Sequence, residues 1–303
     1  MRIVIAGGSG MLGRALAARL TGGGHEVVAL SRRGGTASKN YREVRWTPDG
    51  STGPWAAELE GATAVVNLAG AGIADKRWTA SRKAELRASR IDSTHSLVAA
   101  LTAASNRPSV FVQGSAIGYY GASLNDRPLD ERAPAGHDFL STLASEWEAT
   151  AQPISGLGCR LVVVRTGIVL ASEGGALPPM AMPFRFFAGG PMGTGRQYMS
   201  WVACDDWVSL VVWAITTPAI SGPLNVTAPA PVTNAEFAAA IGRALRRPSW
   251  LPAPGFALRL ALGEMATPML LEGQRVMPAR ATAAGFAFSY FDLDDALAHI
   301  FRE

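Results

Sequence analysis

Three glycines near the start of the chain have the spacing of a nucleotide-binding loop. Gly7, Gly10 and Gly13 follow the apolar run IVI and precede a helical pattern. In such loops the first glycine permits a tight turn, the second lets backbone approach a pyrophosphate, and the third lets helix and strand pack closely. The helix start at Met11 and Leu12 offers free N–H groups to phosphates. The spacing predicts a dinucleotide site, with a glycine turn that binds nothing as the alternative.

The residues after the second predicted strand indicate which dinucleotide is bound. An acidic residue at this place usually binds the ribose diol of NAD, but here Leu30 is followed by Ser31, Arg32 and Arg33. The charge and planar donor fork of an arginine suit the 2′-phosphate of NADP. NADP(H) is therefore the predicted cofactor, and a solvated basic turn is the alternative.

A second stretch, GSAIGYYG, carries groups that can handle a proton. Ser115, Tyr119 and Tyr120 follow a predicted strand, where α/β sheets bind their ligands. A serine hydroxyl can hydrogen-bond a substrate oxygen, and a phenol can act as an acid if its pKa is lowered. Ser115 and Tyr119 are the candidate catalytic residues. The alternative is that the tyrosines pack beneath the loop.

Apolar patterning predicts the elements that position these residues. Short β-branched runs alternate with three-to-four spaced helical patterns, which predicts an α/β class fold. We expect a Rossmann-type doubly wound parallel sheet in residues 1–170, its last strands interleaved with a smaller C-terminal α/β lobe in residues 171–303. The predicted strands are Arg2–Ala6, Glu26–Leu30, Val44–Trp46, Ala64–Asn67, Val110–Gln113 and Arg160–Arg165, and the helices between them are Met11–Leu20, Thr79–Ala104 and Phe139–Gln152.

The second half of the chain has a different character. The segment Gly174–Met199 is rich in glycine, proline and methionine, which predicts loops. Asp130 and Glu131 are expected in a solvated turn, and Asp205 or Asp206 as the cap of a helix that ends at Thr216. The other elements expected are a strand at Leu224–Thr227 and helices at Thr233–Leu245, Pro254–Gly263 and Asp292–Phe301.

Composition excludes several classes of function. The net charge of +4 comes without any block of lysines or arginines, so no nucleic-acid partner is expected. The four histidines are scattered and the two cysteines lack metal-ligand spacing, so no metal site is expected. The most apolar run, LVVVRTGIVL, contains Arg165 and is too short to span a bilayer. We expect a cytoplasmic protein without a membrane partner.

Several motifs together resemble a known family. They are GGSGMLG, NLAGAGI, RKAELRASRI, GSAIGYYG, GGPMGTGRQYMSW and LLEGQRVMPARATAAGFAF. The chain resembles the extended short-chain dehydrogenase/reductase superfamily. Within it, the chain is similar to an atypical branch of "epimerase family" proteins, also called YfcH-like, whose C-terminal domain has no known function. The resemblance covers nearly the whole chain and places that domain at residues 248–303.

The resemblance implies NADP(H) binding and assigns residues to it. Ser31 and Arg32 would meet the adenosine phosphate, and Leu68 and Ala69 would lie along the cofactor. The remaining assignments are Glu85 and Arg90 as contacts from the long helix, Val169 beside the nicotinamide, and Arg196, Gln197 and Trp201 at the far part of the substrate.

One hallmark of that superfamily is missing. Typical members carry a Tyr-x-x-x-Lys pair downstream of the active-site serine, in which the tyrosine exchanges the proton and the lysine lowers its pKa. Residues 138–148 contain neither tyrosine nor lysine, and Phe139 and Leu143 have the spacing instead. The sequence thus predicts an NADP(H)-dependent oxidoreductase or epimerase-like enzyme of unknown small-molecule substrate. The alternative is a non-catalytic NADP-binding protein that acts through a protein partner, as the division-linked relatives of this branch suggest.

Overall fold

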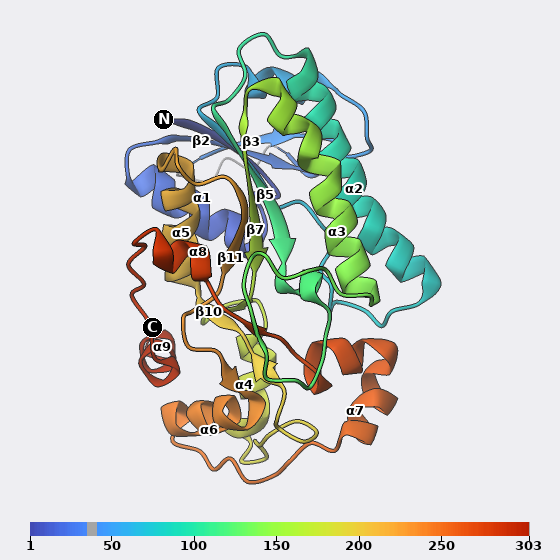
Figure 1. Cartoon of the computed structure of the whole chain (residues 1–303), viewed down its shortest axis with the longest axis vertical. Coiled ribbons are helices and arrows are strands. Elements are labelled where there is room, and N and C mark those ends of the chain that lie inside the picture. Colours follow the sequence, from blue (N-terminus) through green and yellow to red (C-terminus); the bar gives the residue numbers. More distant parts are fainter. Residues whose placement is uncertain (35–40, 303) are drawn as a thin grey trace.

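A parallel sheet of seven strands forms the centre of the molecule, with helices on both faces (Figure 1). The computed structural model describes residues 1–34 and 41–302. The strand order is β11-β7-β5-β4-β1-β2-β3, and every neighbouring pair is parallel. The bounds are Arg2–Ala6 for β1, Glu26–Ser31 for β2, Arg42–Arg45 for β3, Ala64–Asn67 for β4, Val110–Ala116 for β5, Arg160–Thr166 for β7 and Gly222–Val226 for β11.

Alternation of side chains along the strands builds a core on each face of the sheet. Ile3 and Ile5 of β1 pack on one side with the helices α1 (Met11–Gly22) and α5 (Cys204–Thr216). Val4 and Ala6 point to the other side, toward α2 (Ala80–Ala103) and α3 (Phe139–Ala151). Such strands, buried on both faces, are typical of a doubly wound parallel sheet, so the predicted fold class is confirmed.

The side on which new strands are added to the sheet switches between β1 and β4. Strands added after β1 extend the sheet one way through β2 and β3, and later strands extend it the other way from β4. The loops that leave the carboxyl ends of β1 and β4 therefore diverge and leave a crevice, which is where open α/β sheets bind ligands. Gly7 follows β1 and Leu68 follows β4, so both lie at this crevice.

A smaller lobe lies below the carboxyl ends of the strands (Figure 1). Its core includes Phe184, Trp201, Phe237 and Leu297. Its helices are α4 (Leu177–Arg185), α6 (Asn234–Leu245), α7 (Gly255–Leu262) and α9 (Leu293–Ile300), and the short α8 (Ala279–Ala283) packs on β11 of the main sheet.

The short strands pair as β8 (Ile168–Leu170) with β10 (Trp201–Ala203), β9 (Tyr198–Met199) with β12 (Val232–Thr233), and β6 (Pro128–Leu129) with β13 (Arg275–Val276). The short helical segments are the 3-10 segments η1 (Pro54–Leu59), η2 (Ile117–Tyr120), η3 (Gln152–Leu157) and η4 (Gly263–Met265), and the π-helical segment η5 (Thr267–Leu271).

Three expectations for loops and caps were wrong. The segment Gly174–Met199 contains the helix α4, because its prolines occur at the first positions, where no backbone N–H is needed, and only Pro183 lies inside. Neither Asp205 nor Asp206 caps α5, which starts after Ala203. The Asp206 carboxylate instead accepts the backbone N–H groups of Ser289 and Tyr290, at 2.8 and 3.0 Å. It therefore ties the C-terminal segment to α5.

The third correction concerns Glu131. This residue is not in a solvated turn but is 7% exposed. Its Oε1 accepts the backbone N–H groups of Asn225 and Arg280, at 3.1 and 3.3 Å. Burial raises the pKa of the Glu131 carboxyl above its usual range. Because its two partners lie far along the chain, Glu131 joins the sheet to the C-terminal segment.

Within residues 1–34 and 41–302, no helix is long and apolar enough to cross a bilayer. The same residues contain no group of three or more His, Cys, Asp or Glu side chains placed to hold a metal ion.

Candidate functional site

The glycine loop has the geometry that a bound pyrophosphate requires. Gly7 has φ +79°, and a Cβ there would lie 2.7 Å from the Leu68 carbonyl oxygen. A Cβ on Gly13 would lie 2.5 Å from the Gly7 oxygen, so both positions admit only glycine. A Cβ on Gly10 would have a single neighbour within 4 Å, the Gly7 carbonyl oxygen at 3.3 Å. The space above Gly10 is therefore open toward the cavity, and no side chain caps the first turn of α1.

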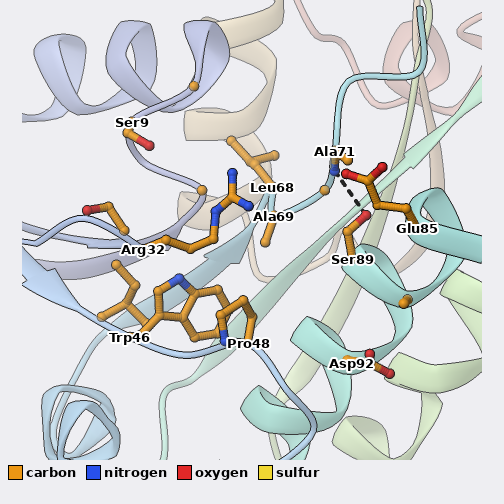
Figure 2. A pocket seen from close by; sticks show the side chains of 16 residues that line it. Ser9, Arg32, Trp46, Pro48, Leu68, Ala69, Ala71, Glu85, Ser89 and Asp92 are labelled. Carbon is orange, nitrogen blue, oxygen red and sulfur yellow. Dashed lines mark hydrogen bonds between the residues drawn. The ribbon is translucent and has the colours of Figure 1, made fainter. Parts of the chain in front are cut away.

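A cavity of about 440 Å³ lies beneath this loop. Figure 2 shows the Arg32 side chain extending over Trp46 into it. Glu85 and Ser89 of α2 form the opposite wall, where the Ser89 hydroxyl accepts the Ala71 N–H at 3.0 Å (Figure 2). The lining residues come from the ends of β1, β2 and β4, the segment after β3, and α2: they are Gly7, Ser9, Gly10, Leu30, Ser31, Arg32, Trp46, Pro48, Leu68, Ala69, Gly70, Ala71, Glu85, Ala88, Ser89 and Asp92.

Arg32 is the exposed cation at this cavity. No carboxylate within the described residues forms a salt bridge with it. By contrast, Arg2 of β1 and Arg82 of α2 each form a salt bridge with a glutamate. Ser31, just before it, is buried, and its hydroxyl donates to Glu43 at 3.1 Å and accepts the Gly34 N–H at 3.0 Å. The serine therefore holds the turn, and the arginine beside it stays available to an anion.

Glu85 and Arg90 occupy different positions on α2. The Glu85 carboxylate accepts a hydrogen bond from Arg82 at 2.7 Å, and this contact holds the pKa of Glu85 below its usual range. Arg90 lies behind the cavity wall, next to Gly70, with its guanidinium 5.1 Å from the Trp147 ring. Burial, together with the nearby Arg82, lowers the pKa of Arg90 to about 10. The two contacts expected from the long helix thus remain predictions, with Glu85 at the cavity and Arg90 beside it.

The start of α1 and the strand β8 meet on the other side of the glycine loop. A Cβ on Gly175 would lie 3.2 Å from the Met11 Cε and 3.5 Å from the Val169 carbonyl oxygen. Leu12 packs against the core beside β1, and Val169 is 7% exposed. Met11, Leu12 and Val169 do not line the cavity under Arg32. Met11 and Leu12 remain predicted phosphate contacts at the helix start, and Val169 remains a predicted neighbour of the nicotinamide.

Ser115 belongs to a buried ionic network at the end of β5. It is 5% exposed, and its hydroxyl donates to Glu148 Oε1 at 2.7 Å. Glu148 comes from α3 and accepts two hydrogen bonds from Arg165, both at 2.9 Å. Because Ser115 pairs with Arg165 in the register of β5 and β7, the sheet itself brings the three groups together. The Glu148–Arg165 pair was not found from the sequence.

The two tyrosines of GSAIGYYG have different surroundings. The Arg165 guanidinium lies 3.4 Å from the centroid of the Tyr119 ring, and the Tyr119 side chain is partly exposed. Tyr120 is buried, and its hydroxyl donates to Asn225 at 2.7 Å and accepts from Arg165 at 3.1 Å. Burial raises the pKa of Tyr120 to about 12. Tyr120 therefore packs beneath the loop, and Tyr119 is the phenol that can still reach a ligand.

Apolar side chains fill the position of the missing Tyr–Lys pair. The Phe139 ring packs edge-on against Trp78, with centroids 5.1 Å apart, and Leu143 is 5% exposed. Met265, from the turn η4, completes this cluster. The nearby amine of Lys83 lies 5.1 Å from the Phe139 ring but is bound to Glu264 at 2.5 Å. No proton carrier replaces the pair at these two positions.

The three residues expected at the far part of the substrate separate into two kinds. Gln197 is fully buried and donates to the carbonyl oxygens of Met192 and Leu270, at 3.0 and 2.6 Å. Trp201 is also fully buried and donates to the Ala230 oxygen at 3.0 Å. Both side chains hold the smaller lobe together, whereas Arg196 is exposed. Of the three, Arg196 has the accessible group that a substrate could contact.

Comparison with known proteins gives the family. The model of the "NAD dependent epimerase/dehydratase family" matches residues 3–226, and that of a domain of unknown function, DUF1731, matches residues 253–300. The chain belongs to the NAD dependent epimerase/dehydratase family. An epimerase family protein of Mycobacterium leprae is 44% identical over 297 residues, which cover 98% of this chain and 94% of that one. Epimerase family protein YfhF of Bacillus subtilis is 40% identical, with 100% and 99% covered.

Solved structures agree with this family assignment. The crystal structure of human epimerase family protein SDR39U1 with NADPH has a TM-score of 0.91 and 37% identity, and each chain is covered completely. UDP-N-acetylglucosamine 4-epimerase from Bacillus cereus has a TM-score of 0.77 at 17% identity, with 99% and 98% covered. The second likeness shows that the epimerase fold is shared. The resemblance expected from the sequence is confirmed, and the chain is an epimerase-like protein of the extended short-chain type.

Proposed function

We propose that this chain binds NADP(H) in the cavity beneath the glycine loop and acts as an oxidoreductase of the epimerase type on a small molecule. The position of Arg32 carries the cofactor assignment, because an exposed arginine that forms no salt bridge with the described carboxylates extends into the cavity directly after β2. The human relative, which matches the whole chain, was crystallised with NADPH. This likeness supports the same cofactor here.

The residues present fit the parts of such a cofactor. Gly7, Gly10 and the uncapped start of α1 would hold the pyrophosphate, and Ser31 with Arg32 would meet the 2′-phosphate. Leu68 and Ala69 would lie along the cofactor where it crosses the end of β4. Met11 and Leu12 would offer backbone N–H groups to the phosphates, and Gly13 would let α1 pack closely on the loop. Val169 would lie beside the nicotinamide, Glu85 would accept from a hydroxyl or amide group, and Arg90 would support the wall at Gly70.

Hydride transfer is the chemistry that a bound nicotinamide supplies, so the chain must handle the proton. The Ser115 hydroxyl gives its own hydrogen to Glu148, which leaves its lone pairs free to accept from a substrate hydroxyl. Tyr119 carries the partly exposed phenol, and the Arg165 guanidinium lies 3.4 Å from the centroid of its ring. Ser115 and Tyr119 would thus share the work that a Tyr–Lys pair does in typical relatives.

A non-catalytic, NADP-binding regulatory protein is the second candidate, and the apolar cluster favours it. Phe139, Leu143 and Met265 close the position at which relatives exchange the proton. A protein with this cluster can bind the cofactor without turning it over. Binding of the cofactor would then change the stability of the protein or its affinity for a protein partner. We place either form in the cytoplasm, the compartment in which the two widely spaced cysteines of the sequence are expected as reduced thiols.

Turnover separates the two candidates. Purified protein loaded with NADPH is incubated with panels of carbonyl compounds and enones, and their reduction is followed by the loss of NADPH absorbance. Protein loaded with NADP+ is incubated with nucleotide sugars, and the formation of epimers is followed by NMR, because epimerisation returns the hydride and leaves no net change in the cofactor. For an enzyme, Ser115→Ala and Tyr119→Phe should each lower kcat by roughly tenfold, the value of a lost neutral hydrogen bond, with the NADPH Kd unchanged. Tyr120→Phe serves as the control, because its hydroxyl is buried. If no compound on any panel reacts, the regulatory protein is supported. If Ser115→Ala and Tyr119→Phe both leave kcat unchanged, the proposed catalytic site is refuted.

A further inference from the structure

Seven large apolar side chains protrude from the lower end of the smaller lobe. Their exposed fractions run from 43% for Leu251 to 79% for Leu260. Figure 1 shows the segment between α6 and α7 along this edge, with α4 above it and α7 at its end. We call this surface the apolar face, and its members are Met182, Phe186, Phe187, Trp250, Leu251, Phe256 and Leu260.

The helix α7 is the clearest sign that something covers this face. Its sequence is GFALRLAL, in which Arg259 is the one polar residue, and none of its residues is buried. Helices that are apolar all round normally lie inside a protein or in lipid. Phe256 and Leu260, one turn apart, are 73% and 79% exposed. Exposed apolar side chains that gather on neighbouring segments mark an interaction site.

The backbone holds the aromatic side chains outward. The Trp250 indole donates to the Phe187 carbonyl oxygen at 3.1 Å, and the N–H groups of Trp250 and Leu251 both donate to the Gly189 oxygen at 3.0 Å. Phe187 itself has φ +59°, a conformation that bulky residues rarely adopt. The two segments are therefore joined into one surface, and its exposed rings are fixed by internal hydrogen bonds.

The charge on this face has a single sign. Segments 177–197 and 245–263 contain no aspartate or glutamate. They carry five arginines, and none of these forms a salt bridge with a carboxylate among residues 1–34 and 41–302: Arg185, Arg196, Arg246, Arg247 and Arg259. The Arg247 guanidinium lies 4.6 Å from the Phe187 ring, so charge and apolar surface are intermixed. A second copy docked here would oppose arginines to arginines, and the occupant must instead be anionic.

We infer that the apolar face docks on the surface of an anionic phospholipid bilayer. Protruding phenylalanine, leucine and tryptophan side chains enter the boundary between headgroups and acyl chains, and arginines beside them bind lipid phosphates. The expectation of no membrane partner rested on the lack of an apolar run long enough to span a bilayer. Docking on the surface of a bilayer needs no spanning helix, so the finding that the described residues contain none is compatible with it.

Sedimentation with lipid vesicles tests this inference. The full chain is mixed with vesicles of phosphatidylcholine and phosphatidylglycerol in equal parts, or of phosphatidylcholine alone, and the bound fraction is measured. We expect binding to the anionic vesicles only. The double variant Phe256→Ser, Leu260→Ser should bind at least tenfold more weakly. Arg185→Gln and Arg259→Gln should each weaken binding by about fivefold, as one surface charge is worth about that factor.

Matched substitutions away from the face serve as controls. Leu124 is 50% exposed and Arg127 is exposed, so Leu124→Ser and Arg127→Gln should bind like the unmodified chain. Thermal unfolding and NADPH titration confirm that each variant is folded. Absence of binding to anionic vesicles overturns the inference, as does binding that the face variants leave intact. A dimer in sedimentation equilibrium that Phe256→Ser, Leu260→Ser dissolves would assign the face to a second copy and also overturn it.

Discussion

Replacing Gly10 with valine should abolish NADPH binding while the chain stays folded. The Cβ position at Gly10 is nearly free of protein atoms, so the branched side chain fits the fold but fills the space over the start of α1. That space is where the pyrophosphate would approach the backbone. Isothermal titration with NADPH and thermal unfolding of the same sample measure the two effects. A folded Gly10→Val protein with unchanged NADPH affinity would contradict the assignment of the loop.

Two other glycines provide the comparison. A Cβ at Gly22, near the end of α1, meets no atom within 4 Å, so Gly22→Val should retain both fold and cofactor affinity. At Gly13 a Cβ would lie 2.5 Å from backbone, and Gly13→Val should lower the stability of the fold itself. The three variants together separate loss of a binding space from loss of structure.

The second large effect is expected at the buried ion pair of Arg165 and Glu148. Their side chains are 3% and 10% exposed, and two hydrogen bonds at 2.9 Å join them. Arg165→Met would leave the Glu148 carboxylate buried without its cation. Removing one partner of a buried pair typically costs about 3–5 kcal/mol of folding free energy. Chemical denaturation of the variant and of the unmodified chain measures this difference.

An exposed ion pair gives the control for this effect. Arg243 and Asp294 form a similar pair at 2.7 Å, but their side chains are 60% and 46% exposed. Such surface pairs contribute about 0–1 kcal/mol, so Arg243→Met should change stability little. The double variant Arg165→Met, Glu148→Met should be more stable than Arg165→Met alone, because no buried charge remains. Equal losses of folding free energy in Arg165→Met and Arg243→Met would contradict the larger contribution expected of the buried pair.

Local patterns in the sequence were sufficient for the elements that build the sheet. The bounds predicted for Arg2–Ala6 and Ala64–Asn67 are those of β1 and β4, because both strands are continuous apolar runs that end at a polar or glycine residue. The start of α6 was equally readable, since Thr233 and Glu236 form a capping box. The strand at Val110–Gln113 extends to Ala116 because β7 pairs with it to Thr166, and no local pattern in GSA records that pairing.

The features that could not be predicted from the sequence depend on contacts between distant segments. Glu131 looked solvated because nothing near it shows that the amides of Asn225 and Arg280 lie beside it. Trp46 and Pro48 line the cavity from beyond β3, and no motif marks them. Arg165 did give a signal, since an arginine inside the apolar run LVVVRTGIVL requires a buried partner. That reasoning would have pointed to a carboxylate such as Glu148.

Paired isothermal titrations of NADPH and NADH test the cofactor assignment most directly. They are performed on the unmodified chain, on Arg32→Ala and on Arg33→Ala. Arg33 is the matched control, because it is exposed like Arg32 but is not among the residues that line the cavity. A charge-assisted contact to the 2′-phosphate is worth about 1.5–3 kcal/mol, so NADPH should bind roughly ten- to a hundredfold more tightly than NADH. The preference should disappear in Arg32→Ala and persist in Arg33→Ala. Equal affinities of the unmodified chain for NADPH and NADH would contradict the role of Arg32 and the choice of NADP(H).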